Sequence, residues 1–296
     1  MASSQVFDRN LLQARRARAQ QLGPATFLID RVAEDLADRL AAVLRQFAVA
    51  VDLGTPTGAL RQVLAASGKI GAVVAVDRIV REGSGLHFVA DEEALPLREA
   101  SVDLIVSGLA LQFVNDLPGT LIQVRRALKP DGLFVAALLG GETLSELRAA
   151  MAQAEAEIEG GVSPRIAPFV DVRELGALLQ RAGFALPVTD VDRLTARYDS
   201  VFSLMHDLRR MGGGNALIER RRVPLRRAML LRMAEIYEAR FADADGRVRA
   251  TFDIVWLSGW APHVSQQQPL KPGSAQARLA DALGAREVSA GEKAGR

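Results

Sequence analysis

The sequence contains no cysteine and only three histidines among 296 residues. Without cysteine, the chain can form no disulfide bond, thiolate zinc site or cysteine-ligated iron–sulfur cluster. This composition fits a reducing compartment, and we expect a cytoplasmic protein. His87, His206 and His263 are far apart in the sequence and belong to no H-x-D motif or close pair. A two-histidine, one-carboxylate iron site is therefore poorly supported, and we predict no metal site.

Long apolar runs are also missing from the sequence. No run approaches the length of a membrane-spanning helix, so we expect no stable membrane insertion. Residues 1–23 lack the apolar core of a secretory signal. Arg15, Arg16 and Arg18 lie between Asp8 and Asp30. We interpret this segment as the basic leading helix of a cytoplasmic protein and not as an organelle transit peptide.

Neither sign of charge dominates the sequence. Lys and Arg total 37 and Asp and Glu total 35, which gives a formal net charge of +2. This excess gives no overall nucleic-acid signature, and we expect no nucleic-acid partner. Arginine is nevertheless clustered at Arg209, Arg210, Arg220, Arg221, Arg222, Arg226, Arg227 and Arg232. The cluster is either a solvated helix face or a docking surface for an acidic partner.

Residues 49–58 read V-A-V-D-L-G-T-P-T-G, and we expect the fold to be organised around them. The apolar run into Asp52 is typical of the end of a buried parallel strand. Gly54 and Gly58 then bracket a tight turn, and A-L-R-Q-V-L-A-A follows with helical spacing. A strand, a glycine turn and a helix form the nucleotide-binding corner of open α/β sheets. The alternative is a plain corner that binds no ligand.

This stretch resembles the first motif of class I S-adenosylmethionine (SAM)-dependent methyltransferases, usually D-x-G-x-G-x-G. Asp52, Gly54 and Gly58 stand at the matching places, but Thr55 and Pro56 depart from the pattern. Proline adds a ring and removes a backbone donor where the motif has glycine. We therefore expect weaker SAM binding than a fuller glycine motif would give.

Two further acids follow predicted strands. Residues 71–77 form a strand that ends in Asp77, where a carboxylate can accept hydrogen bonds from both ribose hydroxyls. That geometry serves NAD as well as SAM, but the G-x-G-x-x-G motif that NAD usually needs is absent. After a short strand at residues 86–89, Asp91 matches the superfamily acid that accepts from the adenine amino group, and Glu92 is next to it. The alternatives are a solvated strand-end acid and a polar loop.

Residues 101–106 form the fourth predicted strand. The loop that follows this strand belongs to the same carboxyl edge, where ligands of open α/β sheets bind. Its candidates for facing the reacting centre are Ser107, Leu109, Gln112 and Asn115. The predicted cofactor-binding set is Asp52, Gly54, Gly58, Asp77, Asp91, Glu92, Ser107 and Leu109. We assign no catalytic residue. Asn115, Asp116 and Glu142 are candidates only, with helix capping or turn formation as the alternative for each.

The pattern predicts an α/β protein with a Rossmann-like class I methyltransferase fold. We expect a mostly parallel seven-stranded sheet whose antiparallel last strand lies between strands 5 and 6. The L-K-P-D-G turn before strand 5 is a familiar mark of this fold. Thr143 is a predicted helix cap, with Glu146 three residues on.

The chain divides into five predicted segments. Residues 1–45 form N-terminal helices over the mouth or edge of the sheet, and residues 46–199 form the SAM-binding domain. Residues 200–240 are a helical cap insertion, residues 241–268 hold the final strand, and residues 269–296 are a flexible tail.

Several motifs go beyond the fold. F-D-R-N-L, V-N-D-L-P, G-G-E-T-L-S-E-L-R and G-G-V-S-P-R-I-A-P-F resemble the family of the fifth assembly factor of mitochondrial respiratory complex I. The match covers nearly the whole chain, and ordinary methyltransferases lack the last two motifs. The eukaryotic family member is reported to hydroxylate an arginine on an iron–sulfur subunit of complex I. Many bacterial relatives are named SAM-dependent methyltransferases.

The resemblance implies a bacterial SAM-dependent enzyme that modifies a protein side chain in complex I assembly. For methyl transfer from an activated donor such as SAM, the site mainly has to position the reactants and exclude water. Hydroxylation needs iron, flavin or another redox cofactor, and here it is implied by the resemblance alone. The alternatives are an O-methyltransferase acting on a small molecule or carrier protein, and a non-catalytic assembly chaperone with a decayed cofactor site.

Overall fold

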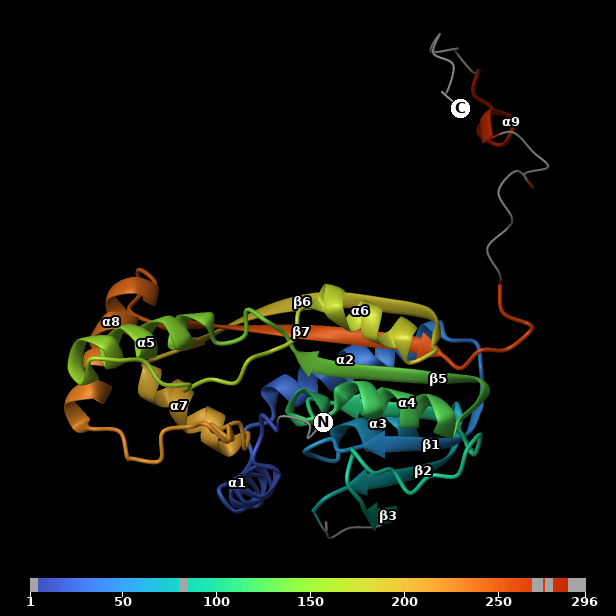
Figure 1. The fold of residues 1–296 in the computed structure, drawn as a ribbon. Helices are drawn as coiled ribbons and strands as arrows, with labels where there is room; N and C mark the ends of the chain where they lie inside the picture. The colour runs from blue at the N-terminus through green and yellow to red at the C-terminus, as the bar shows by residue number, and fades with distance from the viewer. Residues whose placement is uncertain (1–4, 80–84, 268–273, 275–278, 287–296) are drawn as a thin grey trace. The chain divides into compact units, whose positions relative to one another are not determined.

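Seven strands form one sheet in the part of the chain that the computed structural model describes, which is residues 5–79, 85–267, 274 and 279–286. Their order across the sheet is β3-β2-β1-β4-β5-β7-β6 (Figure 1). The strands are β1 (Phe47–Leu53), β2 (Ile70–Asp77), β3 (Leu86–Val89), β4 (Val102–Gly108), β5 (Leu128–Leu139), β6 (Ala185–Tyr198) and β7 (Val248–Trp260).

The pairing of the strands follows the sequence prediction. β3, β2, β1, β4 and β5 are parallel neighbours, whereas β7 runs antiparallel between β5 and β6. β4 reads as a nearly continuous apolar run because both of its faces are buried, as expected for a central parallel strand. The Rossmann-like methyltransferase fold is therefore confirmed.

Helices cover both faces of the sheet. The helices are α1 (Arg9–Gln21), α2 (Phe27–Ala42), α3 (Ala59–Ala66), α4 (Leu117–Ala127), α5 (Ser145–Glu159), α6 (Val172–Arg181), α7 (Val201–Arg210), α8 (Arg227–Phe241) and α9 (Leu279–Leu283). Leu36 of α2 and Leu60 of α3 pack with Leu104 on one face. Leu121 of α4 and Leu179 of α6 pack with Phe134 on the other. The result is a three-layer α/β/α core.

A third apolar cluster lies where β6 and β7 extend beyond the parallel strands (Figure 1). Met151 of α5, Leu204 of α7 and Met233 of α8 pack there against Phe252 of β7. Helices thus occupy the segment predicted to be helical, but residues 211–226 between α7 and α8 form a loop. Residues 1–262 and residues 263–296 form separate units. Much of the predicted flexible tail, residues 269–296, lies outside the described residues.

The predicted cap at Thr143 is wrong. α5 begins after Leu144, whose φ is +56°, and no side chain caps it. The Thr143 hydroxyl instead accepts from the Asp253 N–H (3.1 Å) and donates to the Asp253 carbonyl (3.3 Å). Glu146 accepts from the N–H and hydroxyl of Thr251. Thr143 therefore attaches the G-G-E-T-L turn to β7, and Glu146 attaches the first turn of α5 to the same strand.

Glu155 of α5 organises the G-G-V-S-P-R segment that follows. Its carboxylate is only 1% exposed and accepts from the Ser163 N–H (2.8 Å) and hydroxyl (2.6 Å). Arg165 forms an ion pair with the same carboxylate. Burial raises the pKa of Glu155, but the hydrogen bonds from Arg165 and Ser163 outweigh it and lower the pKa to about 2.

We predict that Glu155→Gln lowers the free energy of unfolding by about 2–3 kcal/mol at neutral pH, because Arg165 loses its buried charged partner. The native pKa of about 2 lies below the ordinary value of 4.5. The stabilisation is therefore complete above about pH 4.5 and is lost as the pH falls towards 2. Urea denaturation of both proteins across this range measures the difference.

Glu157→Gln is the matched control, because Glu157 lies on the same helix but is exposed and paired with Arg232 at the surface. It should change stability little. A stability difference for Glu155→Gln that is equal at neutral and acidic pH would show that the charge of Glu155 is not responsible.

Candidate functional site

The carboxyl ends of β1 and β2 bring two acids together. Asp52 and Asp77 end adjacent parallel strands, are each 3% exposed, and line one crevice with Thr57 and Arg61. Arg61 Nε lies 3.8 Å from Asp52 Oδ2. Asp77 Oδ1 accepts from the Ile79 N–H (3.2 Å). The structure thus brings Asp52 and Asp77 to one crevice at the carboxyl edge of the sheet.

Gly54 occupies a backbone position that only glycine fits. Its φ is +70°, and its N–H donates to the Val76 carbonyl (2.7 Å), which joins the turn to β2. A Cβ at this position would lie 2.7 Å from Glu92 Oε1. Gly58 is the last residue before α3, at the N-terminal cap position of the helix. The glycine corner therefore has the expected strand–turn–helix form.

The two acids after β3 differ in their surroundings. Glu92 is 2% exposed and lies over Gly54, paired with Arg9 and, at 3.8 Å, with Arg16. Asp91 is partly exposed and accepts from Arg9 Nη2 (2.9 Å). The sequence pattern favoured Asp91 for the adenine contact, with Glu92 next to it, whereas the structure buries Glu92 at the glycine turn and leaves Asp91 partly exposed.

The first helix lies across this edge, beyond the arrowheads of β1 and β2 (Figure 1). Two glutamines of this helix also contact the edge of the sheet. Gln13 donates to the Arg78 carbonyl (2.9 Å), and Gln20 donates to the Pro56 carbonyl (3.0 Å). Asn115 accepts from the backbone N–H groups of residues 6 and 7. α1 therefore lies at the mouth of the sheet, one of the two positions expected for the N-terminal helices, whereas α2 packs on the face of the sheet.

Two predicted site residues at the end of β4, Ser107 and Leu109, have different surroundings. The Ser107 hydroxyl is buried and donates to the Leu53 carbonyl (2.8 Å), so it joins β4 to β1. Leu109, with a φ of +51°, lines a cavity together with Gln112, whose side chain donates to the Leu109 carbonyl (2.9 Å). Leu109 and Gln112 thus reach the cavity at the motif turn, and Ser107 has a structural contact.

Thr55 has a role that sequence reasoning missed. Its side chain is buried, and its hydroxyl accepts from the Gly108 N–H (3.0 Å). The residue that departs from the glycine motif therefore fastens the turn to the end of β4. The sequence shows that the motif contains a hydroxyl side chain, but it does not show that this hydroxyl lies within hydrogen-bonding distance of β4.

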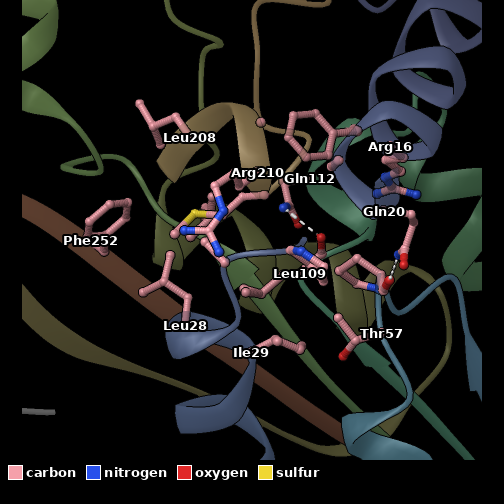
Figure 2. Close-up of a pocket in the computed structure, with 18 of the residues that line it drawn as sticks. Arg16, Gln20, Leu28, Ile29, Thr57, Leu109, Gln112, Leu208, Arg210 and Phe252 are labelled. Carbon is pink, nitrogen blue, oxygen red and sulfur yellow. Dashed lines mark hydrogen bonds between the residues drawn. The ribbon is translucent and has the colours of Figure 1, made fainter. Parts of the chain in front are cut away.

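The cavity at this turn, which we call the inner pocket, is drawn in Figure 2. Thr57, Gln20 and Arg16 lie on one side, and Leu28, Leu208 and Phe252 lie on the other, with Leu109 between them. Its walls come from α1, α2, α7, β7 and the loops after β1 and β4. The inner pocket is thus a mainly apolar cavity beside the motif turn, with Arg16, Gln20 and Arg210 among its polar lining residues.

A second and larger cavity, of about 630 Å³, adjoins the inner pocket, and we call it the arginine chamber. Phe113, Leu144, Leu208 and Gly213 line both cavities. The arginines of the chamber are Arg15, Arg18, Arg165, Arg209, Arg220, Arg221 and Arg222. Its other walls are mainly apolar and come from α1, α5, α7 and the loops at residues 160–170 and 211–226.

The arginine cluster of the sequence does not form one helix face. Arg220, Arg221, Arg222 and Arg226 lie in the loop between α7 and α8 or directly before α8. Several members form internal ion pairs, such as Arg221 with Glu159 (2.8 Å) and Arg220 with Asp8 (3.3 Å). The cluster therefore attaches this loop to neighbouring elements and also faces the chamber.

The catalytic candidates do not line the inner pocket. Asp116 caps α4 by accepting from the Gly119 N–H (2.8 Å), and Glu142 is exposed. Among the described residues, no group of three or more His, Asp and Glu side chains is arranged to hold a metal ion. Within the same residues, no helix combines the length and apolarity needed to cross a membrane.

Comparison with known proteins places this geometry in a family. The methyltransferase domain family matches residues 51–136. "Arginine-hydroxylase NDUFAF5, mitochondrial" of Danio rerio is 37% identical over 286 residues, which cover 93% of this chain and 89% of that protein. The Homo sapiens protein of the same name is 40% identical over 280 residues, which cover 91% and 81%. The chain belongs to the NDUFAF5 family.

Two other comparisons bear on the site and the fold. A "Malonyl-[acyl-carrier protein] O-methyltransferase" of Methylovorus sp. is 35% identical over 231 residues, covering 78% of this chain and 73% of that protein. The structure of YcgJ from Bacillus subtilis superposes with a TM-score of 0.53 at 15% identity, covering 79% and 99% of the two chains. The likeness to YcgJ shows the fold alone. The resemblance that the motifs indicated is thus confirmed.

We predict that Arg9→Met destabilises the protein by about 2–4 kcal/mol, because Glu92 stays buried without its nearest cation. The Arg9 side chain is itself largely buried. Hydrogen exchange should also become faster in α1, since this contact holds the helix on the sheet edge. Urea denaturation and exchange mass spectrometry measure the two effects.

Arg126→Met is the control, because its partner Glu99 and Arg126 itself are 68% and 58% exposed. It should cost no more than about 1 kcal/mol. Unaltered exchange of α1 in Arg9→Met would mean that other contacts position the helix.

Proposed function

We propose that the protein binds SAM at the carboxyl edge of β1, β2 and β4 and modifies a protein side chain during assembly of respiratory complex I. The observation that carries the cofactor proposal is the buried pair Asp52 and Asp77 beside the left-handed Gly54. An acid on each of two adjacent strands at a glycine turn is the arrangement that holds a nucleoside in open α/β sheets. Membership of the NDUFAF5 family supports the proposal that the modified partner is a protein of respiratory complex I.

The residues present fit the chemistry of SAM. The Asp77 carboxylate at the end of β2 would accept from ribose hydroxyls, and Gly54 leaves its backbone without a side chain. Glu92 and Asp91 offer acceptors for the adenine amino group. Because Glu92 Oε1 now lies over Gly54, a nucleoside bound there would move this carboxylate relative to Arg9 and Arg16. The helix α1 is thus coupled to cofactor binding.

The inner pocket would receive the group that is modified. SAM, when bound, supplies a methyl group on a positively charged sulfur. The chain's own task is to hold the acceptor in line and to exclude water, which Leu28, Ile29 and Phe252 favour by lining the pocket with apolar surface. Leu109 and Gln112 close the side nearest β4.

The name arginine-hydroxylase, which the family members carry, favours arginine as the modified side chain, and on this basis we propose an arginine of an iron–sulfur subunit. The same name makes hydroxylation the alternative chemistry at this site. Hydroxylation would need an oxidant or redox cofactor besides SAM. We also propose a cytoplasmic location.

A second candidate function is O-methylation of a small molecule or a carrier-bound acyl group. The observation that favours it is the arginine chamber beside the inner pocket, since guanidinium groups bind carboxylates and phosphates. The match to a malonyl-carrier O-methyltransferase points in the same direction.

We predict that Asp77→Ala weakens SAM binding by about 1–3 kcal/mol, because a ribose hydroxyl loses its acceptor. Isothermal titration with SAM measures the affinity of both proteins. Asp190→Ala, which removes an exposed acid on β6, is the control and should bind SAM as the wild type does. Equal affinities for wild type and Asp77→Ala would refute this placement of the ribose.

Mass spectrometry of complex I subunits from a deletion strain tests the function itself. We expect one side chain to lose a methyl group in the deletion strain and to regain it on complementation with the wild type but not with Asp77→Ala. Loss of an oxygen atom instead would identify hydroxylation. Failure of complex I assembly without any lost modification would identify the assembly chaperone.

A further inference from the structure

The side-chain amide of Gln112 has one hydrogen-bonding group that remains unsatisfied in the described part of the chain. Gln112 is 7% exposed and lines the inner pocket. Its Nε2 donates to the Leu109 carbonyl (2.9 Å), whereas its Oε1 is buried and has no partner among the described residues. We infer that Gln112 Oε1 accepts a hydrogen bond from the substrate and so selects a side chain with a planar N–H donor, such as a guanidine, for the inner pocket.

The orientation of this amide is fixed by its contact with Leu109, which Figure 2 shows as a dashed line. A backbone carbonyl can only accept, so the amide nitrogen of Gln112 faces Leu109 and the amide oxygen is directed away from it. Leu109 is itself held in place, because its N–H donates to the Ala137 carbonyl (2.8 Å). Its φ of +51° is unfavourable for a leucine and persists only where surrounding contacts impose it. The amide oxygen is therefore positioned before a ligand binds.

The two arginines of the inner pocket are paired with acids outside it. Arg16 Nη1 lies 3.8 Å from a Glu92 oxygen, and Arg210 Nη1 lies 3.2 Å from an Asp207 oxygen. A guanidine beside Gln112 would therefore not face uncompensated cations. No Asp or Glu is among the described residues that line the pocket, so the acceptor on offer is a neutral amide oxygen. Because a buried acceptor without a donor is unfavourable, a substrate N–H would relieve that cost.

The size of the inner pocket matches the end of one side chain. Its volume is about 90 Å³, against about 630 Å³ for the arginine chamber. Sites that enclose a whole small molecule usually measure roughly 300–1,000 Å³. The inner pocket is too small for such a ligand, and it can take a group that a larger partner inserts.

An arginine side chain has the two chemical parts that this pocket can receive. Its methylene groups would pack against the apolar wall formed by Leu28, Ile29 and Phe252. Its planar head carries N–H groups, which Gln112 Oε1 would accept. This step rests on the proposed function, in which the inner pocket receives the side chain that is modified. A site built to accept an N–H group rejects an analogue without one, because its buried acceptor then stays unpaired.

Titration with three probes that share a propyl chain tests the inference without SAM. N-propylguanidine and N-propylurea have planar heads with N–H groups, whereas propyl acetate has a planar head without one. We expect both N–H probes to bind the wild type about tenfold more tightly than propyl acetate, or better. Because no cofactor is present, failure here is distinct from failure of SAM binding. Equal binding of propyl acetate, or no binding of N-propylguanidine, would overturn the inference.

Matched variants separate substrate recognition from the support of Leu109. Gln112→Met keeps the length of the side chain and should weaken N-propylguanidine binding about tenfold while leaving propyl acetate binding unchanged. A role confined to holding Leu109 predicts an equal loss for both probes and would refute the inference. Gln13→Met is the control, because Gln13 also donates to a backbone carbonyl (2.9 Å) but does not line the inner pocket. It should leave all three affinities unchanged.

Nuclear magnetic resonance of the isotope-labelled wild type observes the contact directly. The resonance of the Gln112 side-chain carbonyl should shift when N-propylguanidine is added and stay in place when propyl acetate is added, because a hydrogen bond polarises the group that accepts it. This measurement needs no variant, so it decides the question even if Gln112→Met fails to fold. A carbonyl resonance that stays unchanged while N-propylguanidine binds would place the probe elsewhere and refute the role of Gln112.

Discussion

The burial of Glu92 at the end of β3 is the constraint on which the arrangement of the site depends. A carboxylate removed from water needs a cation close to it, and α1 supplies two, Arg9 and Arg16. This requirement fixes the N-terminal helix across the carboxyl edge of the sheet. The same helix contributes Arg16 and Gln20 to the inner pocket and Arg15 and Arg18 to the arginine chamber. One buried charge thus determines the outer wall of both cavities.

Acidic side chains of α5 play a corresponding part on the other side of the chamber. Glu155 binds Ser163, Arg165 and Arg221, and Glu159 binds Arg221 and Arg226. These contacts hold the loops at residues 160–170 and 211–226 against one helix. The chamber therefore has walls from four distant parts of the sequence, joined mainly by guanidinium–carboxylate pairs. Part of its charge is therefore a by-product of the way in which its loops are anchored.

Much of the fold could be predicted from the sequence because its signals are local. The apolar run into Asp52 and the glycine at residue 54 each depend on neighbours within a few positions. The L-K-P-D-G segment indicated the fold, but it lies within β5 at an irregularity of the strand and not in a turn before it. The strand order followed from the fold that these signals indicate. By contrast, the contacts of Thr55 with Gly108 and of Thr143 with Asp253 join residues far apart in the chain. A hydroxyl that looks like a helix cap in the sequence was instead bound by a strand more than a hundred residues later.

The candidate site divides in the same way. Asp52, Gly54 and Asp77 could be placed at one edge because parallel strands end together. The difference between Asp91 and Glu92 could not be predicted, since it depends on which carboxylate the arginines of α1 reach. The arginine chamber could not be predicted either, because α1, α5, α7 and two loops meet there only in the folded chain. The arginine cluster left a solvated helix face and a docking surface for an acidic partner as alternatives, and it gave no indication of a cavity.

The place of β7 in the sheet has a consequence for how the chain folds during synthesis. β7 lies between β5 and β6 but is the last of the seven strands to be made. Until it emerges from the ribosome, β5 presents an open edge with unpaired backbone groups, which is a template for association with other chains. The helices α7 and α8 are completed before that edge closes. A nascent chain of this protein therefore spends the synthesis of residues 140–247 with an incomplete sheet, and a chaperone that shields the edge of β5 would be most useful in that interval.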